Sequence, residues 1–301
     1  MKNLRIQLII ILLTGLVVGL LLISEQTGFR LISPAPARGG TYTEALLGNL
    51  QRLNPVLDYY NVPDRDVDRL IFSSLFKFDE RGLPVGDLAE EWGISYDGLL
   101  YNITLRGNAL WHDNQPVTAS DVVFTIEMMR DKNSVLPQDL KTFWDGIEVL
   151  ALSDQVLQFK LAEPFAPFMD YLTFGVLPKH LLSSLGYQEM LVSAFNLQPI
   201  GSGPFKFERL IVEAGEIKGV VLSANLQFYG NVPTISHLAF RYYADLPKAF
   251  SAYKEGKVQA LSNLEGDVLK EVLNEPDLSV YSIKKPEVSL VLLNLNNPDV
   301  K

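Results

Sequence analysis

The segment ALWHDNQPVTASDVVFTIE, residues 109–127, contains the signals that decide the fold of this chain. Thr118 occupies the expected N-cap of a helix, because its hydroxyl can meet the backbone N–H of Asp121 and the Asp121 carboxylate can return the bond. Pro116 keeps the residue before it extended, which places a turn ahead of the cap. Apolar side chains then follow at helical spacing: Val122, Ile126 and Met129. The segment therefore predicts a turn, a capping box with aspartate in place of glutamate, and an amphipathic helix.

The same segment crowds together polar side chains of the kinds found in reactive sites. His112 and Asp113 are adjacent, so their side chains point to opposite sides of an extended backbone and cannot easily share a metal ion or a proton. No partner nucleophile and no ligand spacing accompanies them. Trp111 is expected to extend the alternating strand of residues 101–105 toward the turn. We therefore expect this segment to start a helix rather than to perform catalysis.

Strand and helix patterns alternate on both sides of this segment. Alternating apolar and polar residues predict strands, and turn-prone residues between such runs predict hairpins. The expected strands are residues 41–46, 101–105, 147–152, 157–161, 205–212, 220–226, 238–242 and 288–295. The expected helices are residues 67–75, 165–174, 179–185, 246–255 and 268–273. Together the hairpins and helices predict an α/β or α+β body.

The first of these helices has a simple amphipathic pattern. Its apolar stripe is formed by Val67, Leu70, Ile71 and Leu75. Asp66, Asp68 and Arg69 lie on its other faces. The helix at residues 246–255 is expected to start at Asp245 and to stop at Gly256.

Composition limits the classes of function. The chain has 301 residues, of which 48% are hydrophobic and 20% charged, so it can bury a large core in one big domain or two modest ones. The net charge of -9 leaves no basic surplus to neutralise phosphates, which argues against nucleic acid as a partner. The absence of cysteine excludes disulfides, thiolate metal sites, cysteine nucleophiles and a lipid anchor on a cysteine.

The N-terminus predicts membrane targeting. Lys2 and Arg5 precede an apolar run that extends to Ile23; counted from Ile6 it has 18 residues and would span about 27 Å as a helix. We expect residues 1–24 to be an uncleaved membrane anchor, with a cleaved signal segment as the alternative, because the A-x-A sequence at residues 35–37 lies far from the run and contains proline. The positive charges keep the N-terminus in the cytoplasm, so the domain is expected on the extracellular or periplasmic face. Residues 25–38 form the expected linker.

Several motifs in order along the chain resemble family 5 of the extracellular solute-binding proteins, the peptide, dipeptide and nickel receptors of ABC importers. The longest is LAEEWGISYDGLLYNITLRGNALWHDNQPVTASDVVFTIEM at residues 88–128. The others are GGTYTEAL (39–46), LNP (53–55), PIGSGPFKF (199–207), ANLQFYGNVPTISHLAFRYYAD (224–245), AYKEGKVQAL (252–261) and VSLVLLNLNN (288–297). One departure is Asn114, which stands where the family usually has glycine. The resemblance covers nearly all of the chain after the N-terminal segment.

The resemblance implies an α/β fold of the periplasmic-binding-protein type (type II, family 5), with mixed sheets flanked by helices. It implies a solute-binding domain over residues 39–301, divided into lobe I at about 39–73 and 195–285, a small subdomain at about 74–194, and the start of a second lobe at about 286–301. Family members continue through an opposing lobe, whereas this chain resembles the first lobe and its small subdomain. We therefore expect weak binding, and nanomolar affinity measured on residues 39–301 would contradict this expectation.

The resemblance also implies a function. Family members capture peptides or other small solutes outside the membrane and deliver them to an ABC permease, without covalent chemistry or a cofactor. The loop after LNP lines the cleft in relatives, which makes Tyr59, Tyr60, Asn61 and Val62 the expected ligand-binding residues. The alternative for the two tyrosines is that they pack against the lobe.

Two other functions stay open at this point. One is a membrane-anchored interaction or sensor module that retains the fold without closing on a ligand. The other is a membrane-anchored hydrolase, which would need a convergent set of acid, base or nucleophile. The GSG sequence at 201–203 is not the G-x-S-x-G of a nucleophile elbow and is expected to form a tight crossover between subdomains. His180, His237 and the pair Glu90–Glu91 are expected to be hydrogen-bonded or solvated surface residues.

Overall fold

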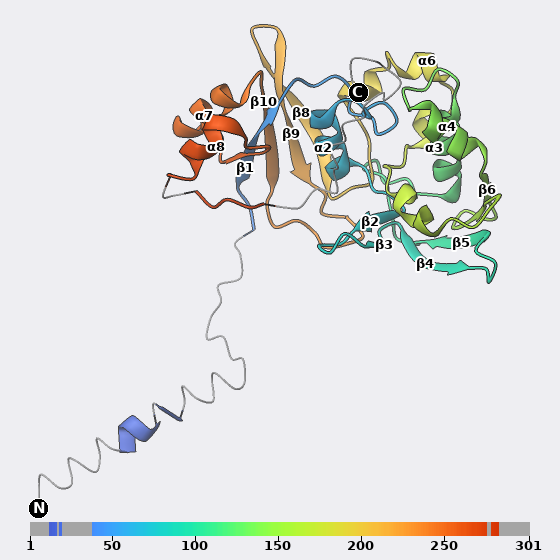
Figure 1. The fold of residues 1–301 in the computed structure, drawn as a ribbon, viewed down its shortest axis with the longest axis horizontal. Coiled ribbons are helices and arrows are strands. Elements are labelled where there is room, and N and C mark those ends of the chain that lie inside the picture. The colour runs from blue at the N-terminus through green and yellow to red at the C-terminus, as the bar shows by residue number, and fades with distance from the viewer. Residues whose placement is uncertain (1–11, 17, 20–37, 276–277, 283–301) are drawn as a thin grey trace, which may run out of the picture.

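The larger of the two main sheets has five strands. The computed structural model describes residues 12–16, 18–19, 38–275 and 278–282, and Figure 1 shows its ribbon. The strands lie in the order β11-β1-β10-β9-β8. Their bounds are β1 (Thr41–Leu47), β8 (Phe205–Glu213), β9 (Glu216–Ala224), β10 (His237–Tyr243) and β11 (Ala260–Leu261). β1 pairs in parallel with both β10 and β11, whereas the β10–β9 and β9–β8 pairs are antiparallel.

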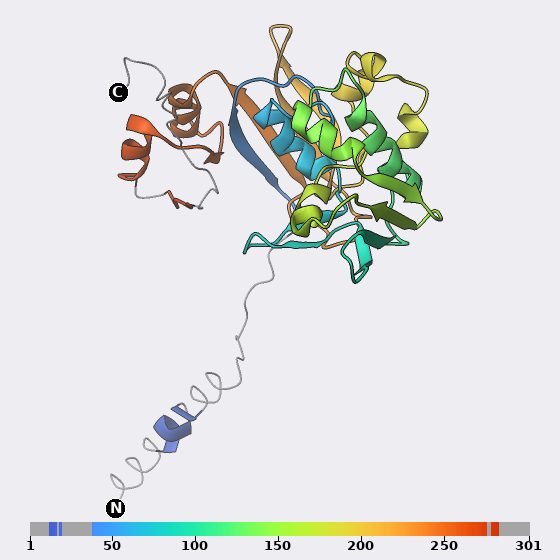
Figure 2. The same cartoon turned by 45° about the vertical axis from the view of Figure 1, so that its right-hand side comes forward.

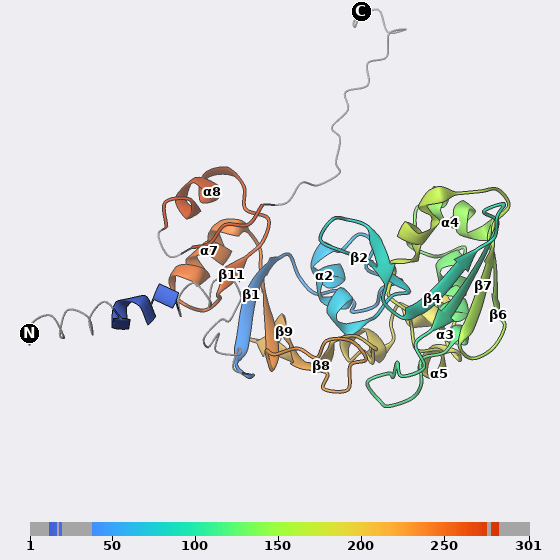
Figure 3. The same ribbon diagram turned by 90° about the horizontal axis from the view of Figure 1, so that it is seen from below.

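Helices cover both faces of this sheet. Figure 3 shows α7 (Leu246–Lys254) and α8 (Gly266–Val272) on one side of β1, and α2 (Val62–Ile71) on the other. Adjacent residues of β1 show why both faces are covered, because successive side chains of a strand point to opposite faces. Ala45 packs with Ala249 and Ala252 of α7, whereas Leu46 belongs to the main core.

The smaller sheet has four antiparallel strands in the order β4-β5-β7-β6. These strands are β4 (Ala89–Ile94), β5 (Leu100–Leu105), β6 (Glu148–Ala151) and β7 (Val156–Lys160). The helices beside this sheet are α3 (Ala119–Arg130), α4 (Gln138–Asp145), α5 (Lys179–Leu182), α6 (Tyr187–Met190) and the 3-10 helices η1 (Ala166–Leu172) and η2 (Ala194–Leu197). A short hairpin, β2 (Phe76–Phe78) with β3 (Pro84–Gly86), lies between the two sheets.

One hydrophobic core extends across both sheets. It contains Leu222 and Phe240 of the larger sheet together with Ile103 and Phe159 of the smaller one. Because this core is shared, the packing does not mark a boundary between lobe I and the small subdomain. The predicted division of the chain into these two parts stays a prediction.

The predicted helix start at Thr118 is confirmed. The Asp121 carboxylate accepts hydrogen bonds from the backbone N–H of Thr118 at 2.8 Å and from its hydroxyl at 2.9 Å. The second carboxylate oxygen accepts from the backbone N–H of Lys179 at 2.8 Å, so the same side chain also fixes the start of α5. Asn114, in the turn ahead of the cap, has a φ of 70°. Asparagine adopts this left-handed conformation more readily than most residues, which explains how it replaces the usual glycine.

The GSG sequence forms the expected tight crossover. A Cβ on Gly201 would lie 1.9 Å from the carbonyl oxygen of Ile71, and one on Gly203 would lie 2.5 Å from that of Leu70. Ser202 is fully buried, and its carbonyl accepts a hydrogen bond from the Ser73 hydroxyl at 3.1 Å. The chain therefore crosses directly against the C-terminal end of α2, at a distance that only glycine permits.

The other expectations have mixed outcomes. The hairpins β6–β7 and β8–β9 and the helix α7, capped by Asp245 at 2.9 Å, are confirmed. The helix expected at residues 165–174 is instead the 3-10 helix η1. The extension of the 101–105 strand to Trp111 is wrong, because β5 ends at Leu105 and Trp111 instead bonds across the turn to Gln115.

Parts of the predicted N- and C-terminal segments lie outside the described residues. Residues 12–16 and 18–19 of the expected anchor are helical, and the rest of residues 1–24 is not described. Within the part of the chain that the structure describes, none of the helices combines the length and the apolar character needed to cross a bilayer. The strand expected at residues 288–295 and the expected start of the second lobe also lie outside the described residues.

Candidate ligand-binding site

A pocket of about 670 Å³ opens between α2 and the helices of the smaller sheet. Its lining comes from the loop 55–59, from α2, from α3 and α4, and from the segment 170–175 that ends η1. Figure 2 shows α2, in blue, beside the green helices of the smaller sheet. The volume lies within the range of roughly 300 to 1,000 Å³ found for small-molecule sites. The loop that leads into α2 follows the carboxyl end of β1, which is where open sheets with parallel strands bind ligands.

One wall of the pocket is apolar and aromatic. Trp144, Tyr171 and Phe174 belong to it, together with Met129 and Leu136. The rings of Trp144 and Phe174 meet edge to face at 5.5 Å, and Tyr171 packs at 4.5 Å from Phe143 behind it. These contacts hold the rings in place, so the wall is preformed.

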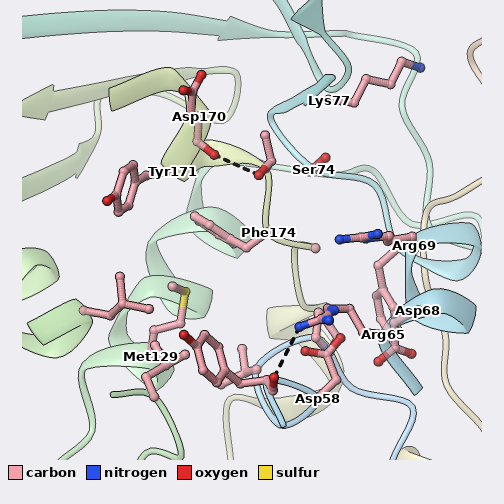
Figure 4. Close-up of a pocket in the computed structure, with 18 of the residues that line it drawn as sticks. Asp58, Arg65, Asp68, Arg69, Ser74, Lys77, Met129, Asp170, Tyr171 and Phe174 are labelled. Atoms are coloured by element: carbon pink, nitrogen blue, oxygen red, sulfur yellow. Dashed lines mark hydrogen bonds between the residues drawn. The ribbon is translucent and has the colours of Figure 1, made fainter. Parts of the chain in front are cut away.

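The opposite wall is charged and comes mostly from α2. It contains Arg65, Asp68 and Arg69, with Asp58 from the preceding loop. Figure 4 shows Arg65 and Arg69 extending from α2 toward the side of the pocket that carries Phe174. Lys77 also lines the pocket, but its charge is matched by Asp87 at 3.1 Å.

Burial dominates the electrostatics of this charged wall. Asp68 is 2% exposed, and among the described residues neither of its carboxyl oxygens has a hydrogen-bond partner. Burial, followed by the nearby carboxylates of Asp58 and Asp64, raises the pKa of Asp68 well above its usual value. Burial also raises the pKa of Asp58 to about 7, against the opposing effect of Arg65. At neutral pH the two carboxyl groups together therefore carry at most one negative charge.

Asp64 and Tyr242 complete the surroundings of Asp68. Asp64 accepts hydrogen bonds from the backbone N–H groups of Gln51 and Arg52, the closer at 2.7 Å. The buried hydroxyl of Tyr242 on β10 has no hydrogen-bond partner among the described residues. Its pKa is raised by burial and then by the nearby carboxyl groups of Asp64 and Asp68.

Of the four predicted ligand-binding residues, Tyr59 alone belongs to the lining of this pocket, and the other three follow it in the chain. Tyr59 lines the pocket, and its ring meets that of Tyr60 edge to face at 4.9 Å. Tyr60 is 73% exposed and Val62 is 45% exposed, so neither packs into the lobe. Asn61 is the N-cap residue of α2, and its side chain donates to the carbonyl of Asn49 at 3.2 Å. The assignment of these four residues to ligand binding stays a prediction.

Sequence reasoning missed the charged wall and the aromatic wall. The signal for the first was the spacing of Arg65, Asp68 and Arg69, at i, i+3 and i+4, which places them on one side of the helix. Asp68 lies at the edge of the apolar stripe, three residues before Ile71, so the sequence alone does not decide whether it is buried. The aromatic wall combines residues from three separate segments and has no local signal.

The polar cluster ahead of α3 has a structural role. His112 lies against the crossover, where its Nε2 is 3.1 Å from the carbonyl of Gly203 and its Nδ1 accepts from the N–H of Gly201 at 3.2 Å. A neutral ring satisfies both contacts, and burial lowers the pKa of His112 to about 4. Asp113 points elsewhere and pairs with His180 at 2.8 Å.

The remaining histidine and acidic residues also fit the expected surface roles. His237 lies 3.3 Å from Glu208, and Glu90 and Glu91 are exposed on β4. Among the described residues no group of three or more His, Cys, Asp or Glu side chains is arranged to hold a metal ion.

Comparisons with known proteins agree on one family. Residues 84–301 match the family described as "Bacterial extracellular solute-binding proteins, family 5 Middle". A putative ABC transporter peptide-binding protein of Brucella ovis is 34% identical over 179 residues, which cover 58% of this chain and 32% of that protein. The oligopeptide-binding protein AppA of Bacillus subtilis is 26% identical over 228 residues, which cover 74% of this chain and 40% of AppA.

Solved structures show the same fold. NikZ from Campylobacter jejuni, in complex with Ni(L-His), superimposes with a TM-score of 0.67 at 34% identity over 79% of this chain and 46% of NikZ. AppA from Bacillus subtilis, in complex with a nonapeptide, gives a TM-score of 0.67 at 25% identity over 74% of this chain and 44% of AppA. The chain thus spans between 32% and 46% of the length of these relatives.

The family match over residues 84–301 and the agreement of fold with solved relatives lead to one conclusion. The chain belongs to family 5 of the bacterial extracellular solute-binding proteins, which are not enzymes.

Proposed function

We propose that this protein is the substrate-binding component of an ABC importer, capturing oligopeptides or a related small solute outside the membrane and delivering it to a permease. The observation that carries the proposal is the pocket of about 670 Å³ with one aromatic and one charged wall. Such a pocket suits an amphipathic solute that has polar groups along an apolar body. The relatives named as peptide-binding proteins, and the nonapeptide bound to AppA, support peptides as the first class to test.

The ligand-binding part of the proposal extends from the pocket to the exposed loop before α2. Tyr59 reaches both regions, because it lines the pocket and contacts Tyr60. A peptide that lies along this loop would place one end in the pocket and its body against Tyr60, Asn61 and Val62. Exposed aromatic faces at such a position bind varied side chains without selecting one strongly.

The proposal includes attachment to the membrane through residues 1–24. The support is the sequence of that segment, in which two positive charges precede a long apolar run. Attachment would hold the domain close to a permease on the extracellular or periplasmic face. Cell fractionation with and without residues 1–24 tests this part, since a membrane-anchored protein should move to the soluble fraction when the segment is removed.

Calorimetric titration of the full chain, kept in a nonionic detergent, with mixtures of peptides tests the binding function. We expect saturable heats, and we expect mass spectrometry to recover every peptide intact afterwards. Saturable binding with peptide cleavage would show an enzyme instead. The absence of any heat with peptides of two to nine residues would refute peptide capture and would favour an interaction or sensor module.

A further inference from the structure

We propose that the pocket selects solutes that carry a free carboxylate next to a large apolar group, with the carboxylate held by Arg65 and Arg69. This inference rests on the proposed function as a solute receptor and specifies the chemical class of its ligand. Four features of the pocket carry it: the placement of the two arginines, their unused hydrogen-bond donors, the charge around them, and the wall that faces them.

The two arginines are placed as a pair. They are four residues apart on α2, so their side chains leave neighbouring positions on the same side of the helix, with Cβ atoms about 6 Å apart. Both line the pocket, and Figure 4 shows both extending into it. Two like charges at this spacing destabilise a helix slightly, so a bound anion between them would stabilise the arrangement.

Both guanidinium groups have donors without a partner among the described residues. Arg65 donates through one terminal nitrogen to the carbonyl of Tyr59 at 3.3 Å, which leaves its other terminal nitrogen without a hydrogen bond among the described residues. Its Nε is buried and also has no partner there. The Arg69 side chain is exposed and makes no hydrogen bond or salt bridge within the described part of the chain. Lys77 differs, because Asp87 already pairs with it. A planar carboxylate matches the forked donors of a guanidinium group.

The acids of the same wall do not neutralise the two arginines. Asp58 and Asp68 carry at most one negative charge between them at neutral pH, because burial favours their protonated forms. Two positive charges therefore face one negative charge or none on this wall. Asp170 also lines the pocket, on the side away from this wall. A carboxylate that lies against the two arginines meets a net attraction, whereas an ammonium group meets repulsion.

The wall that faces the arginines defines the other half of the ligand. Trp144, Tyr171 and Phe174 offer aromatic surface, and Met129 adds an adaptable apolar side chain. In Figure 4 the labelled Tyr171, Phe174 and Met129 lie across the pocket from Arg65 and Arg69. An aromatic C-terminal residue of a peptide carries both a carboxylate and a ring, so it satisfies both walls at once.

The test compares the tripeptide Ala-Ala-Phe with its C-terminal amide, by calorimetric titration of the full chain in nonionic detergent. The two probes differ only in the charged group that Arg65 and Arg69 would hold. We expect the free acid to bind at least about tenfold more tightly than the amide. The variant Arg69→Gln should lose this preference, and it should fold normally because Arg69 makes no hydrogen bond to the other residues that the structure describes. The matched control is Arg81→Gln, which removes an exposed arginine of the β2–β3 turn outside the pocket and should retain the preference.

The outcomes separate this inference from the proposed function. Equal affinity for the acid and the amide would overturn carboxylate selection while leaving peptide binding intact. A preference that survives in Arg69→Gln, or that Arg81→Gln abolishes equally, would overturn the assignment to the arginine pair. A chain that binds neither probe would overturn both the inference and peptide capture.

Discussion

Replacing Asp68 by asparagine should stabilise the protein, and the gain should grow as the pH rises. Asparagine has nearly the shape of a protonated aspartate but cannot ionise. Asp68 is buried, and burial together with the Asp58 and Asp64 carboxylates raises its folded-state pKa. In the unfolded chain the same side chain loses its proton near its ordinary pKa of about 4. The folded wild-type protein therefore holds a proton that the unfolded chain releases.

The sign and size of the effect follow from this difference. A carboxyl group with a raised folded-state pKa contributes its full stability below the unfolded pKa and loses it as the pH rises toward the folded value. Each pH unit in that interval costs the wild-type protein about 1.4 kcal/mol relative to Asp68→Asn. Between pH 4.5 and 6.5 the difference should grow by roughly 2 to 3 kcal/mol while Asp68 keeps its proton in the folded state. That is a large share of the roughly 5 to 15 kcal/mol by which domains are stable.

Urea unfolding followed by tryptophan fluorescence measures the effect at several pH values. The fully buried Trp144 beside the pocket provides a signal from the relevant region. Titrating groups far from Asp68 act in both proteins and largely cancel in the comparison. Asp58 interacts with Asp68, so its change is part of the measured difference. The matched control is Asp170→Asn, an exposed carboxylate at the pocket, for which no such growth is expected. A free-energy difference for Asp68→Asn that stays constant from pH 4.5 to 6.5, or a destabilised variant at pH 6.5, would refute the reasoning.

Three further predictions concern the crossover, the buried histidine and the exposed loop. Gly201→Ala should destabilise the fold by about 2 kcal/mol or more, because the added Cβ would lie 1.9 Å from the carbonyl oxygen of Ile71. The control is Gly93→Ala, where an added Cβ has no atom within 4 Å. Urea unfolding should show that this control is nearly neutral. His112 has a folded pKa lowered to about 4, so its contribution is complete above pH 6.5 and is lost as the pH falls toward 4, by about 3 kcal/mol in total. His112→Gln should remove this part of the acid dependence, and an unchanged slope between pH 6.5 and 4 would contradict it. Tyr60→Ala should weaken peptide binding about threefold to tenfold in calorimetry without changing stability, because the ring is 73% exposed; unaltered affinity would remove Tyr60 from the site.

Local signals in the sequence were sufficient for much of the fold. The cap at Thr118 and Asp121, the hairpin β6–β7 and the helix started by Asp245 each depend on residues close together in the chain. The GSG crossover could also be predicted, because three small residues beside proline permit a close approach of backbones. One local prediction was wrong, namely that the strand at residues 101–105 extends to Trp111. The backbone N–H and carbonyl of Trp111 instead form hydrogen bonds within the turn that follows it.

The candidate site depended much more on the tertiary structure. The loop with Tyr59 and Tyr60 was chosen through resemblance, and its neighbours in space could not be inferred from it. Asp68 shows the limit clearly: helical periodicity places it at the edge of the apolar stripe, and only the tertiary structure shows that it is buried, near Asp58 and Tyr242. Periodicity gives the direction of a side chain from its helix axis, but the cost of burying a charge depends on what the rest of the chain places there.

The sequence by itself determined the α/β class, the positions of most caps and turns, and the membership of a solute-binding family, because these follow from local hydrogen bonding, periodicity and ordered motifs. Only the tertiary structure brought Arg65 and Arg69 of α2 opposite Trp144, Tyr171 and Phe174. Those residues come from segments far apart in the chain, and their proximity results from how two sheets pack around one shared core.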